Sequence, residues 1–324
     1  NVHPKAQPRR RKIGRIPLQS LRQTSNPNQR KMKAPTISIL TTVYNREKYL
    51  AECIESVQNG HFQDYEHIIV DDGSTDGSVA LAQAYAAEDA RIRVYQNETN
   101  LGDYPNRNQA ASYATGKYIK YLDADDMLTN FMLEIMLHAM EENPTTALGL
   151  FDHSILRPVY PQQLKPREFY LKSFNGKNDF IHRSPLGAII NRDVFNQEGG
   201  FSLERMTGDF ELWLRLGARY PTVIIPGGAP GRHRDHDEQE MSLHRSDGIW
   251  PLKYEIITLE KLSSPNCPLT SEEQKFHSWA QKRKIARTIL YGIKRHGLFK
   301  AIQMKEHYQT SWFSLIKNAF SSFE

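Results

Sequence analysis

The feature that most constrains the fold is a regular alternation of apolar runs and helix-type segments between residues 36 and 122. The apolar runs are rich in β-branched residues and predict buried strands at residues 36–42, 68–70, 92–95 and 118–122. Apolar residues recur at helical spacing over 47–58, and further helices are expected from about 78 to 87 and through 109–113. Strand–helix alternation favours a parallel sheet with helices on both faces, so the predicted fold class is α/β.

The rest of the chain is less regular, and it sets the predicted domain boundaries. Helices are expected over about 130–142 and over 209–216, whereas residues 227–245 are rich in Gly, His, Asp and Arg and favour a loop. Beyond Trp250 helical patterns dominate. We therefore predict a basic, poorly packed extension over residues 1–33, an α/β domain over 34–250 and a helical extension over 251–324.

The net charge of +5 is unevenly distributed along the chain. Residues 1–33 carry ten Lys or Arg and no acid, which leaves 32 bases against 37 acids in the remainder. Such a segment either contacts anionic lipid or nucleic acid or is a solvated extension, and we favour the solvated extension. No nucleic-acid partner is expected, because no aromatic residues are interleaved with the basic ones.

Cysteine content and hydropathy bear on the compartment. The two cysteines, Cys53 and Cys267, lie far apart and form neither a disulfide framework nor a C-x-x-C site. No apolar run is long enough to cross a membrane, and the N-terminus has no apolar signal core. The expected location is the cytoplasm, including the inner face of the membrane. The apolar, partly basic segment 312–320 either docks on a membrane surface or, as we favour, packs on the body or pairs two chains.

Polar residues follow three of the predicted strands at the point where the apolar run stops. They lie at 42–44, 71–72 and 123–126. Ligands of parallel α/β sheets bind outside the carboxyl ends of the strands, so these groups are expected to form one site. Asp123 and Asp125 either hold a hard divalent cation or belong to a solvated turn before a helix.

Several short motifs in fixed order resemble those of the family 2 glycosyltransferases, whose fold is the GT-A fold. They lie at residues 36–45 (TISILTTVYN), 69–77 (IVDDGSTDG), 100–102 (NLG), 107–108 (RN), 116–119 (GKYI) and 122–126 (LDADD). Weaker matches follow at residues 199–201 (GGF), 209–216 (DFELWLRL) and 234–236 (RDH). The resemblance covers roughly residues 35–245 and implies a Rossmann-like, mostly parallel sheet with helices on both faces, followed by a C-terminal helical region.

The resemblance implies a metal-dependent transferase that inverts the anomeric centre. Its donor would be a nucleotide-diphosphate sugar, with a UDP-sugar favoured, and its acceptor a hydroxyl of a carbohydrate or glycolipid. The expected cofactor is Mg²⁺ or Mn²⁺. Residues 34–130 would form the nucleotide-binding half and 131–250 the acceptor half. By analogy, the chain would assemble bacterial surface polysaccharide or glycolipid, with possible peripheral membrane contact.

The resemblance also assigns roles to residues of the donor site. Thr42 and Tyr44 would line the nucleobase pocket, with the Tyr44 ring stacked on the base. Asp72 would accept a hydrogen bond from the base. Arg107 would reach the base or the diphosphate, unless it is only an exposed helix charge. Asp123 would contact the ribose.

The remaining roles concern the metal and the proton. Asp125 would bind the metal across the diphosphate, and Asp126 would share that role. His236 would be a further metal or diphosphate contact, with His233 as the alternative and a satisfied loop histidine as the ordinary interpretation.

Asp209 is the candidate general base, and its ordinary interpretation is a helix N-cap. The family usually has Glu-Asp at this point, whereas this chain has Gly208 before Asp209.

The sequence also bears on three other classes of protein. A nucleotidyltransferase is expected to carry a Gly-rich, basic loop after the first strand, and residues 41–46 contain no Gly. A calcium-binding loop requires a Gly that is missing after Asp125. A non-catalytic sugar-nucleotide or carbohydrate binder remains an alternative, because Gly208 breaks the acid pair.

Overall fold

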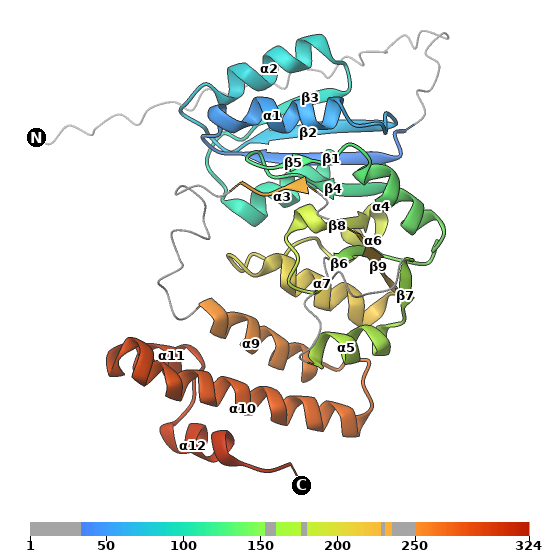
Figure 1. Cartoon of the computed structure of the whole chain (residues 1–324). Coiled ribbons are helices and arrows are strands. Elements are labelled where there is room, and N and C mark those ends of the chain that lie inside the picture. Colours follow the sequence, from blue (N-terminus) through green and yellow to red (C-terminus); the bar gives the residue numbers. More distant parts are fainter. Residues whose placement is uncertain (1–33, 153–159, 176–179, 228–230, 235–249, 324) are drawn as a thin grey trace, which may run out of the picture. The chain divides into compact units, whose positions relative to one another are not determined.

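The computed structural model describes residues 34–152, 160–175, 180–227, 231–234 and 250–323 (Figure 1). Residues 34–324 form one compact unit. Its centre is an eight-stranded sheet in the order β3-β2-β1-β4-β8-β6-β9-β7. The predicted domain boundary at residue 250 stays a prediction. The helix that follows it, α9 (Trp250–Leu262), contributes Ile257 and Leu262 to the same apolar core as the sheet.

The first half of the sheet is the predicted strand–helix alternation. Its elements are β1 (Ile37–Val43), α1 (Glu47–Gln58), β2 (Tyr65–Asp71), α2 (Ser78–Glu88), β3 (Ile92–Gln96), α3 (Asp103–Ser112) and β4 (Tyr118–Tyr121). β1 pairs in parallel with both β2 and β4, and β2 pairs in parallel with β3. The carboxyl ends of these four strands therefore lie at one edge of the sheet.

The second half of the sheet departs from the parallel pattern. Its elements are β5 (Met127–Leu128), α4 (Met132–Glu141), β6 (Leu148–Asp152), β7 (Gln162–Leu164), α5 (Pro166–Phe174), a 3₁₀ turn (Pro185–Gly187), β8 (Ala188–Asn191), α6 (Arg192–Gln197), α7 (Gly208–Arg219), β9 (Thr222–Pro226) and β10 (Gly231–Arg232). β8 lies antiparallel between β4 and β6, and β7 is an antiparallel edge strand. β10 pairs with β5 in a separate two-stranded sheet within the predicted loop region.

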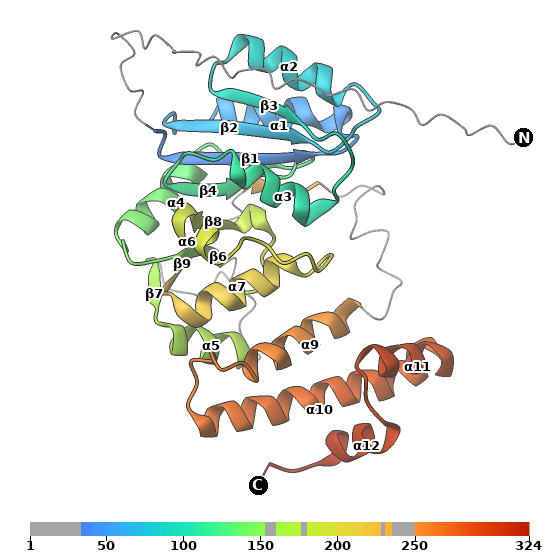
Figure 2. The same ribbon diagram turned by 180° about the vertical axis from the view of Figure 1, so that it is seen from behind.

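Helices cover both faces of the sheet, as the sequence predicts. Successive side chains of a strand point to opposite faces, so Ile37 and Ile39 of β1 join a core with α1 and α4. Leu40 joins a second core with α3 and α7, which contains the fully buried Trp213. Figure 1 shows α1 in front of the sheet, and Figure 2, from behind, shows α3 in front of it.

The chain ends in four helices. They are α9 (Trp250–Leu262), α10 (Ser271–His296), α11 (Leu298–His307) and α12 (Trp312–Phe320). A capping box at Thr270 and Glu273 begins α10, and Gly297, with a φ of 85°, ends it. The four helices share a small apolar core of their own. Within the described part of the chain, no helix combines the length and hydropathy that a membrane crossing requires.

Candidate active site

The three polar strand ends singled out in the sequence meet at one edge of the sheet. β1 lies between β2 and β4, and all three run in parallel. Thr42 pairs with Val70, directly before Asp71 and Asp72, while Leu40 pairs with Tyr121, two residues before Asp123. Side chains from three separate strand–helix units are therefore neighbours at this edge, which we call the rim.

Asp72 is buried at the rim and organises the loop that precedes α3. One carboxylate oxygen accepts hydrogen bonds from Asn97 Nδ2 at 2.8 Å and from the Leu101 amide at 2.9 Å. The other accepts from the Gly102 amide at 2.9 Å. A carboxylate offers about four lone-pair positions, so one remains for a further donor. Asp71 turns away, and one of its oxygens accepts from the amides of Gly73 and Ser74.

The predicted base-stacking side chain is accessible. Tyr44 is 49% exposed, directly after the last residue of β1. Thr42 is partly buried and lies two residues before Tyr44, within β1. Asn45 holds the turn between them and α1, since its backbone has a φ of 52° and its side-chain oxygen accepts from the Thr75 amide at 2.8 Å. The turn thus presents an aromatic ring at the rim on a fixed backbone.

Arg107 is buried, so the interpretation as an exposed helix charge is wrong. Its guanidinium lies 2.6 Å from Asp103 Oδ1, one helical turn earlier, and 2.8 Å from Asp123 Oδ1 at the end of β4. Burial opposes ionisation of both Arg107 and Asp123. The ion pair outweighs it, raising the pKa of Arg107 well above its ordinary value and lowering that of Asp123. A permanent positive charge therefore stands at the rim.

Asp125 is paired with a residue that the sequence analysis did not select. Arg46 Nε lies 3.1 Å from Asp125 Oδ2. The same guanidinium donates to the carbonyl oxygens of Tyr44 and Asn45. Arg46 thus joins the turn after β1 to the loop at residues 123–126 after β4, which we call the acidic loop. Its place directly after the Tyr44-Asn45 motif was the available signal in the sequence.

Asp126 is contacted by His233 and Arg234, the two residues that follow β10. His233 Nδ1 is 3.1 Å from Asp126 Oδ1, and the Arg234 amide donates to the same oxygen at 3.4 Å. The hydrogen bond to Asp126 raises the pKa of His233 to about 9, so this imidazole is charged at neutral pH. His236 lies outside the described residues, and its role stays a prediction.

The acidic loop fits a divalent cation in its donor chemistry. Asp126 Oδ2 is buried and has no hydrogen-bond partner among the residues that the structure describes, and burial together with the charges of Asp123 and Asp125 raises the pKa of Asp126. Among the described residues no three His, Cys, Asp or Glu side chains are grouped to hold a metal alone. Mg²⁺-type sites commonly use one or two carboxylates and complete the set with phosphate oxygens. Asp125 and Asp126 suit that kind of site.

Asp209 lies in the first turn of α7 and connects to the rim through α3. The helix begins at Gly208 with Thr207 as its N-cap, so the interpretation of Asp209 as the N-cap is wrong. Tyr104 Oη lies 3.3 Å from Asp209 Oδ1 and also accepts from the Asp209 amide at 3.3 Å. Burial raises the pKa of Asp209 to about 6, although the Phe210 amide stabilises the ionised form.

Gly208 makes the approach of Tyr104 possible. A Cβ atom at Gly208 would lie 2.9 Å from two ring atoms of Tyr104, closer than real Cβ contacts come. Any larger residue at position 208, including the acid usual in the family, would displace that ring. Tyr104 therefore occupies the space that the missing side chain leaves, and its hydroxyl reaches Asp209. No local sequence signal marks this contact, because the two residues are 105 positions apart.

Lys120 is a second residue that sequence reasoning missed, and it anchors the end of the strand that precedes the acidic loop. Lys120, in β4, is fully buried, and its ammonium group donates to the carbonyl oxygens of Tyr121, Pro185 and Leu186. Burial lowers the pKa of Lys120 to about 7. The side chain ties the end of β4 to the 3₁₀ turn before β8. A lysine within an apolar strand is a signal for such a buried anchor.

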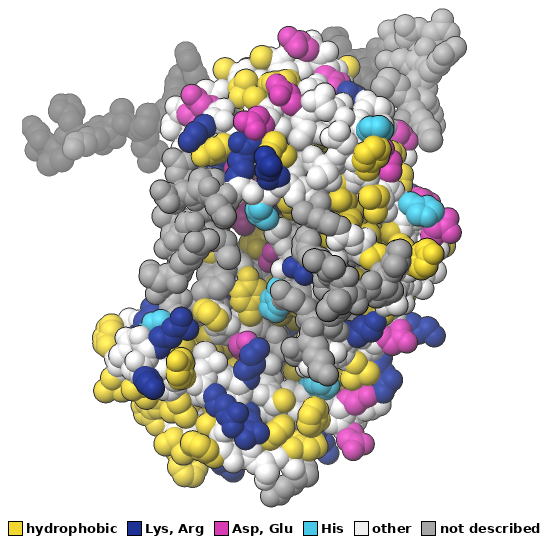
Figure 3. All heavy atoms as spheres, in the orientation of Figure 1, with side chains coloured by type: hydrophobic (Ala, Val, Ile, Leu, Met, Phe, Trp, Pro, Cys, Tyr) yellow, Lys and Arg dark blue, Asp and Glu magenta, His cyan; other side chains and the backbone are white. Residues whose placement is uncertain are grey.

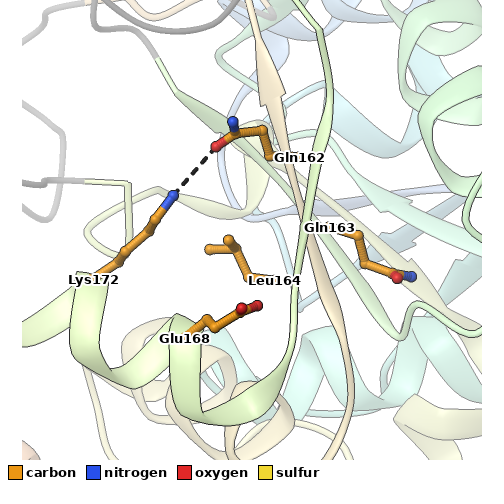
Figure 4. A pocket seen from close by; sticks show the side chains of 5 residues that line it. All are labelled: Gln162, Gln163, Leu164, Glu168 and Lys172. Atoms are coloured by element: carbon orange, nitrogen blue, oxygen red, sulfur yellow. Dashed lines mark hydrogen bonds between the residues drawn. The ribbon is translucent and has the colours of Figure 1, made fainter.

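A surface hollow elsewhere contains none of the predicted site residues. It lies at the outer edge of the sheet and is lined by Gln162, Gln163, Leu164, Glu168 and Lys172 of β7 and α5 (Figure 4). Lys172 Nζ donates to Gln162 Oε1 at 3.2 Å across its mouth. The candidate active site is therefore the rim and not this hollow.

Comparisons with known proteins agree with the family resemblance. The family model for glycosyl transferase family 2 matches residues 38–199. EpsE of Bacillus subtilis, a putative glycosyltransferase, is 38% identical over 56% of this chain and 66% of its own length. An uncharacterized glycosyltransferase of Methanocaldococcus jannaschii is 33% identical over 57% of this chain and 65% of its own length.

The matched region covers between 35% and 45% of the length of several other curated relatives. One of these, the glycosyltransferase GlyG of Streptococcus pneumoniae, is 38% identical over 33% of this chain and 35% of its own length.

The solved structures show the same fold. The structure of TarS 1–349 of S. aureus superposes with a TM-score of 0.62 over 87% of this chain and 80% of that one, at 16% identity. The same protein in complex with UDP-GlcNAc gives 0.62 over 85% of this chain and 91% of that one, at 15% identity. At this identity the likeness establishes the fold, and it confirms the predicted GT-A architecture.

Proposed function

Because the chain belongs to the glycosyl transferase family 2, we propose that it moves a sugar from a nucleotide-diphosphate sugar to an acceptor hydroxyl with inversion at the anomeric carbon. The observation that supports this most is the convergence at the rim. Carboxylates and cations from three parallel strand–helix units meet there, and Tyr104 connects them to the carboxylate of Asp209. A binding site for a diphosphate and a base for a hydroxyl proton are thereby combined.

We propose a UDP-sugar as the donor. A solved structure of the same fold, TarS, is a complex with UDP-GlcNAc. In this chain the exposed ring of Tyr44 would stack on the nucleobase, next to Thr42. The remaining lone pair of Asp72 would accept from the base, and Asp123 would contact the ribose. These roles are the ones that the family resemblance implies, and they are supported by the position of the four side chains at or just after the ends of β1, β2 and β4.

The cofactor would be Mg²⁺ or Mn²⁺, held by Asp125 with Asp126. When bound it would neutralise charge on the diphosphate. The acceptor is proposed to be a carbohydrate or glycolipid used in surface polymers; one relative, 30% identical over 48% of this chain, is a teichoic acid polymerase of Staphylococcus epidermidis. The proposed location is the cytoplasm, at the inner face of the membrane.

In the proposed reaction the acceptor oxygen attacks the anomeric carbon from the face opposite the diphosphate. The carbon–oxygen bond to the diphosphate breaks, and its electron pair leaves with the phosphate oxygen. Arg107 is permanently charged and is placed to stabilise that oxygen. The proton of the acceptor hydroxyl passes to Asp209. A carboxylate with a pKa near 6 is ionised at neutral pH and is more basic than an ordinary one.

The decisive experiment separates binding from transfer. Nucleotide sugars are first screened by the rise in melting temperature that they cause in the presence of Mn²⁺, since a ligand of the native state raises it. Product formation is then measured for the native chain, Asp209→Asn and the control Asp193→Asn, whose side chain is 86% exposed on α6. We expect Asp209→Asn to bind the donor with unchanged affinity and to lose transfer by at least about a thousandfold.

The alternative function is a non-catalytic binder of sugar nucleotides. It would be established if the native chain bound a donor but neither transferred nor hydrolysed it. Full activity of Asp209→Asn would instead remove Asp209 from the mechanism and leave the transferase proposal to another base.

A further inference from the structure

One face of α12 carries large apolar side chains that nothing in the described structure covers. Phe313 and Phe320 are each 78% exposed, and Ile316 is 53% exposed. Together with the exposed Lys317 they recur at intervals of three and four residues, so they lie on one side of the helix. We call these four residues the α12 face.

The opposite side of α12 packs against the rest of the helical region. Leu315 and Ala319 are buried there, in the small core that includes Ile285 and Ile289 of α10. At the end of the helix the Trp279 indole donates to Ser321 Oγ at 2.9 Å. The helix is therefore docked on its inner side, and the α12 face points away from the molecule.

Further apolar side chains are exposed in the same region. Leu298 and Phe299, at the start of α11, are 59% and 75% exposed, and Phe323 is 40% exposed. Figure 3 shows hydrophobic side chains gathered over the part of the molecule where α10–α12 lie, with Lys and Arg side chains between them. Exposed apolar clusters of this kind mark interaction surfaces.

The charge of this region identifies the partner. Residues 271–324 contain ten Lys or Arg and four acids, whereas residues 34–270 contain 22 Lys or Arg and 33 acids. Three of these basic residues lie on or beside α12. Arg283 Nε and Arg287 Nε donate to the carbonyl oxygen of Ala319, next to Phe320, and Lys317 is part of the face itself.

We propose that the α12 face docks on an anionic lipid bilayer, with α12 lying in the plane of the membrane surface. Apolar side chains on one face of a helix with Lys and Arg around them bind such surfaces by combining burial in the acyl boundary with attraction to the headgroups. A second copy of the chain would bring two positively charged regions together. Residues 1–33 carry ten Lys or Arg and no acid, so they have the wrong sign to cover the face.

The test uses the full chain and vesicles, and needs neither donor nor activity. Binding is measured by co-sedimentation with phosphatidylcholine vesicles that contain about one third phosphatidylglycerol, and with vesicles of phosphatidylcholine alone. We expect binding to the anionic vesicles only, weakened by 0.5 M salt, which screens charges beyond a few ångströms. Phe313→Ala with Phe320→Ala should weaken the partition coefficient by more than about tenfold, because it removes the two most exposed apolar rings.

Two further variants make the outcome specific. Lys317→Gln should weaken binding to anionic vesicles by about fivefold, since each basic residue near the surface contributes about this much. Tyr160→Ala is the matched control, because Tyr160 is 77% exposed and lies before β7, and it should bind as the native chain does. All variants should keep the native melting temperature.

Three results would overturn the proposal. One is the absence of binding to anionic vesicles at low salt. Another is unchanged binding by the Phe313/Phe320 double variant, which would assign any membrane affinity to another part of the chain. The third is a native dimer, seen by analytical ultracentrifugation, that the double variant dissociates while vesicle binding is absent. In that case the α12 face joins two copies of the chain.

Discussion

Replacing Tyr104 by Phe should shift the pH dependence of transfer without removing the base. The change deletes one hydroxyl and keeps the ring that packs against Gly208. The hydroxyl lies 3.3 Å from Asp209 Oδ1, and in the native chain this contact favours the ionised carboxylate. The other charged groups that act on Asp209 are Arg107 and Asp103 of α3, and both remain in the variant.

The size of the shift follows from the geometry. A hydrogen bond to a charged group contributes about 1.5–3 kcal/mol, and the long distance places this one at the lower end. One pKa unit corresponds to about 1.4 kcal/mol, so the pKa of Asp209 should rise from about 6 by up to about one unit. The base acts only when ionised. Activity should therefore be lost as the pH falls through the pKa, and the variant should lose it at a higher pH.

The assay is kcat/KM for the donor between pH 5 and pH 9 at saturating metal. At pH 6 the variant should be several-fold slower than the native chain, and at pH 8.5 the two should differ by less than about twofold. Tyr113→Phe is the matched control, since Tyr113 lies at the opposite end of α3 from Tyr104 and its hydroxyl also makes a hydrogen bond, accepted from Gln109. Identical acid limbs for the native chain and Tyr104→Phe would refute the contact between Tyr104 and Asp209 as an influence on the base.

Two further predictions concern stability and charge. Arg107→Met should lower the free energy of unfolding by about 3–5 kcal/mol in urea titration, because it leaves the Asp123 carboxylate without its buried cation; a loss below about 1 kcal/mol would contradict that pairing. Gly217→Ala should lower it by roughly 1–3 kcal/mol, since the new Cβ would lie 2.3 Å from a ring atom of Phe169. Its kcat should stay within about twofold of native, because Gly217 lies near the end of α7, about two turns from Asp209.

The parts of the fold that sequence predicted well are those governed by local periodicity. The helix predicted over residues 47–58 is α1, with the same bounds, and the apolar segment 312–320 is α12. The bounds predicted for β1, β2, β3 and β4 differ from the observed bounds by at most three residues, since each strand is a short apolar run that stops at polar residues. The prediction of one site followed from parallel pairing alone, because parallel strands end at one edge.

The contacts that determine the chemistry were beyond local reasoning. Whether Arg107 is exposed depends on Asp123, which approaches it from β4 and not from its own helix. The partner of Asp209 is on α3, and nothing in either segment indicates the other. The antiparallel insertion of β8 between β4 and β6 also has no local signature, because the hydrogen-bonding direction of a short apolar strand is not encoded in its composition.

The pairing of charges at the rim leads to a last prediction, which concerns the coupling between metal and donor. Three rim carboxylates each face a cation: Asp123 with Arg107, Asp125 with Arg46, and Asp126 with His233. These pairs cancel apart from Asp103, which also faces Arg107, so a divalent cation alone adds positive charge that is only partly compensated, and a diphosphate alone adds negative charge. Together they preserve the balance, with carboxylates able to turn to the metal and guanidinium groups to the phosphates.

Metal and nucleotide diphosphate should therefore bind cooperatively at the rim. Isothermal titration of UDP should give an affinity at least about tenfold higher with Mn²⁺ or Mg²⁺ than with EDTA. Thermodynamic linkage then requires UDP to raise the affinity of the chain for the metal by the same factor. Arg46→Gln should reduce this coupling, since it removes the positive charge that faces Asp125 and lets the metal bind well alone. Equal UDP affinity with and without metal would contradict this coupling and show that the diphosphate is held by the cations of the rim, without a metal on Asp125 and Asp126.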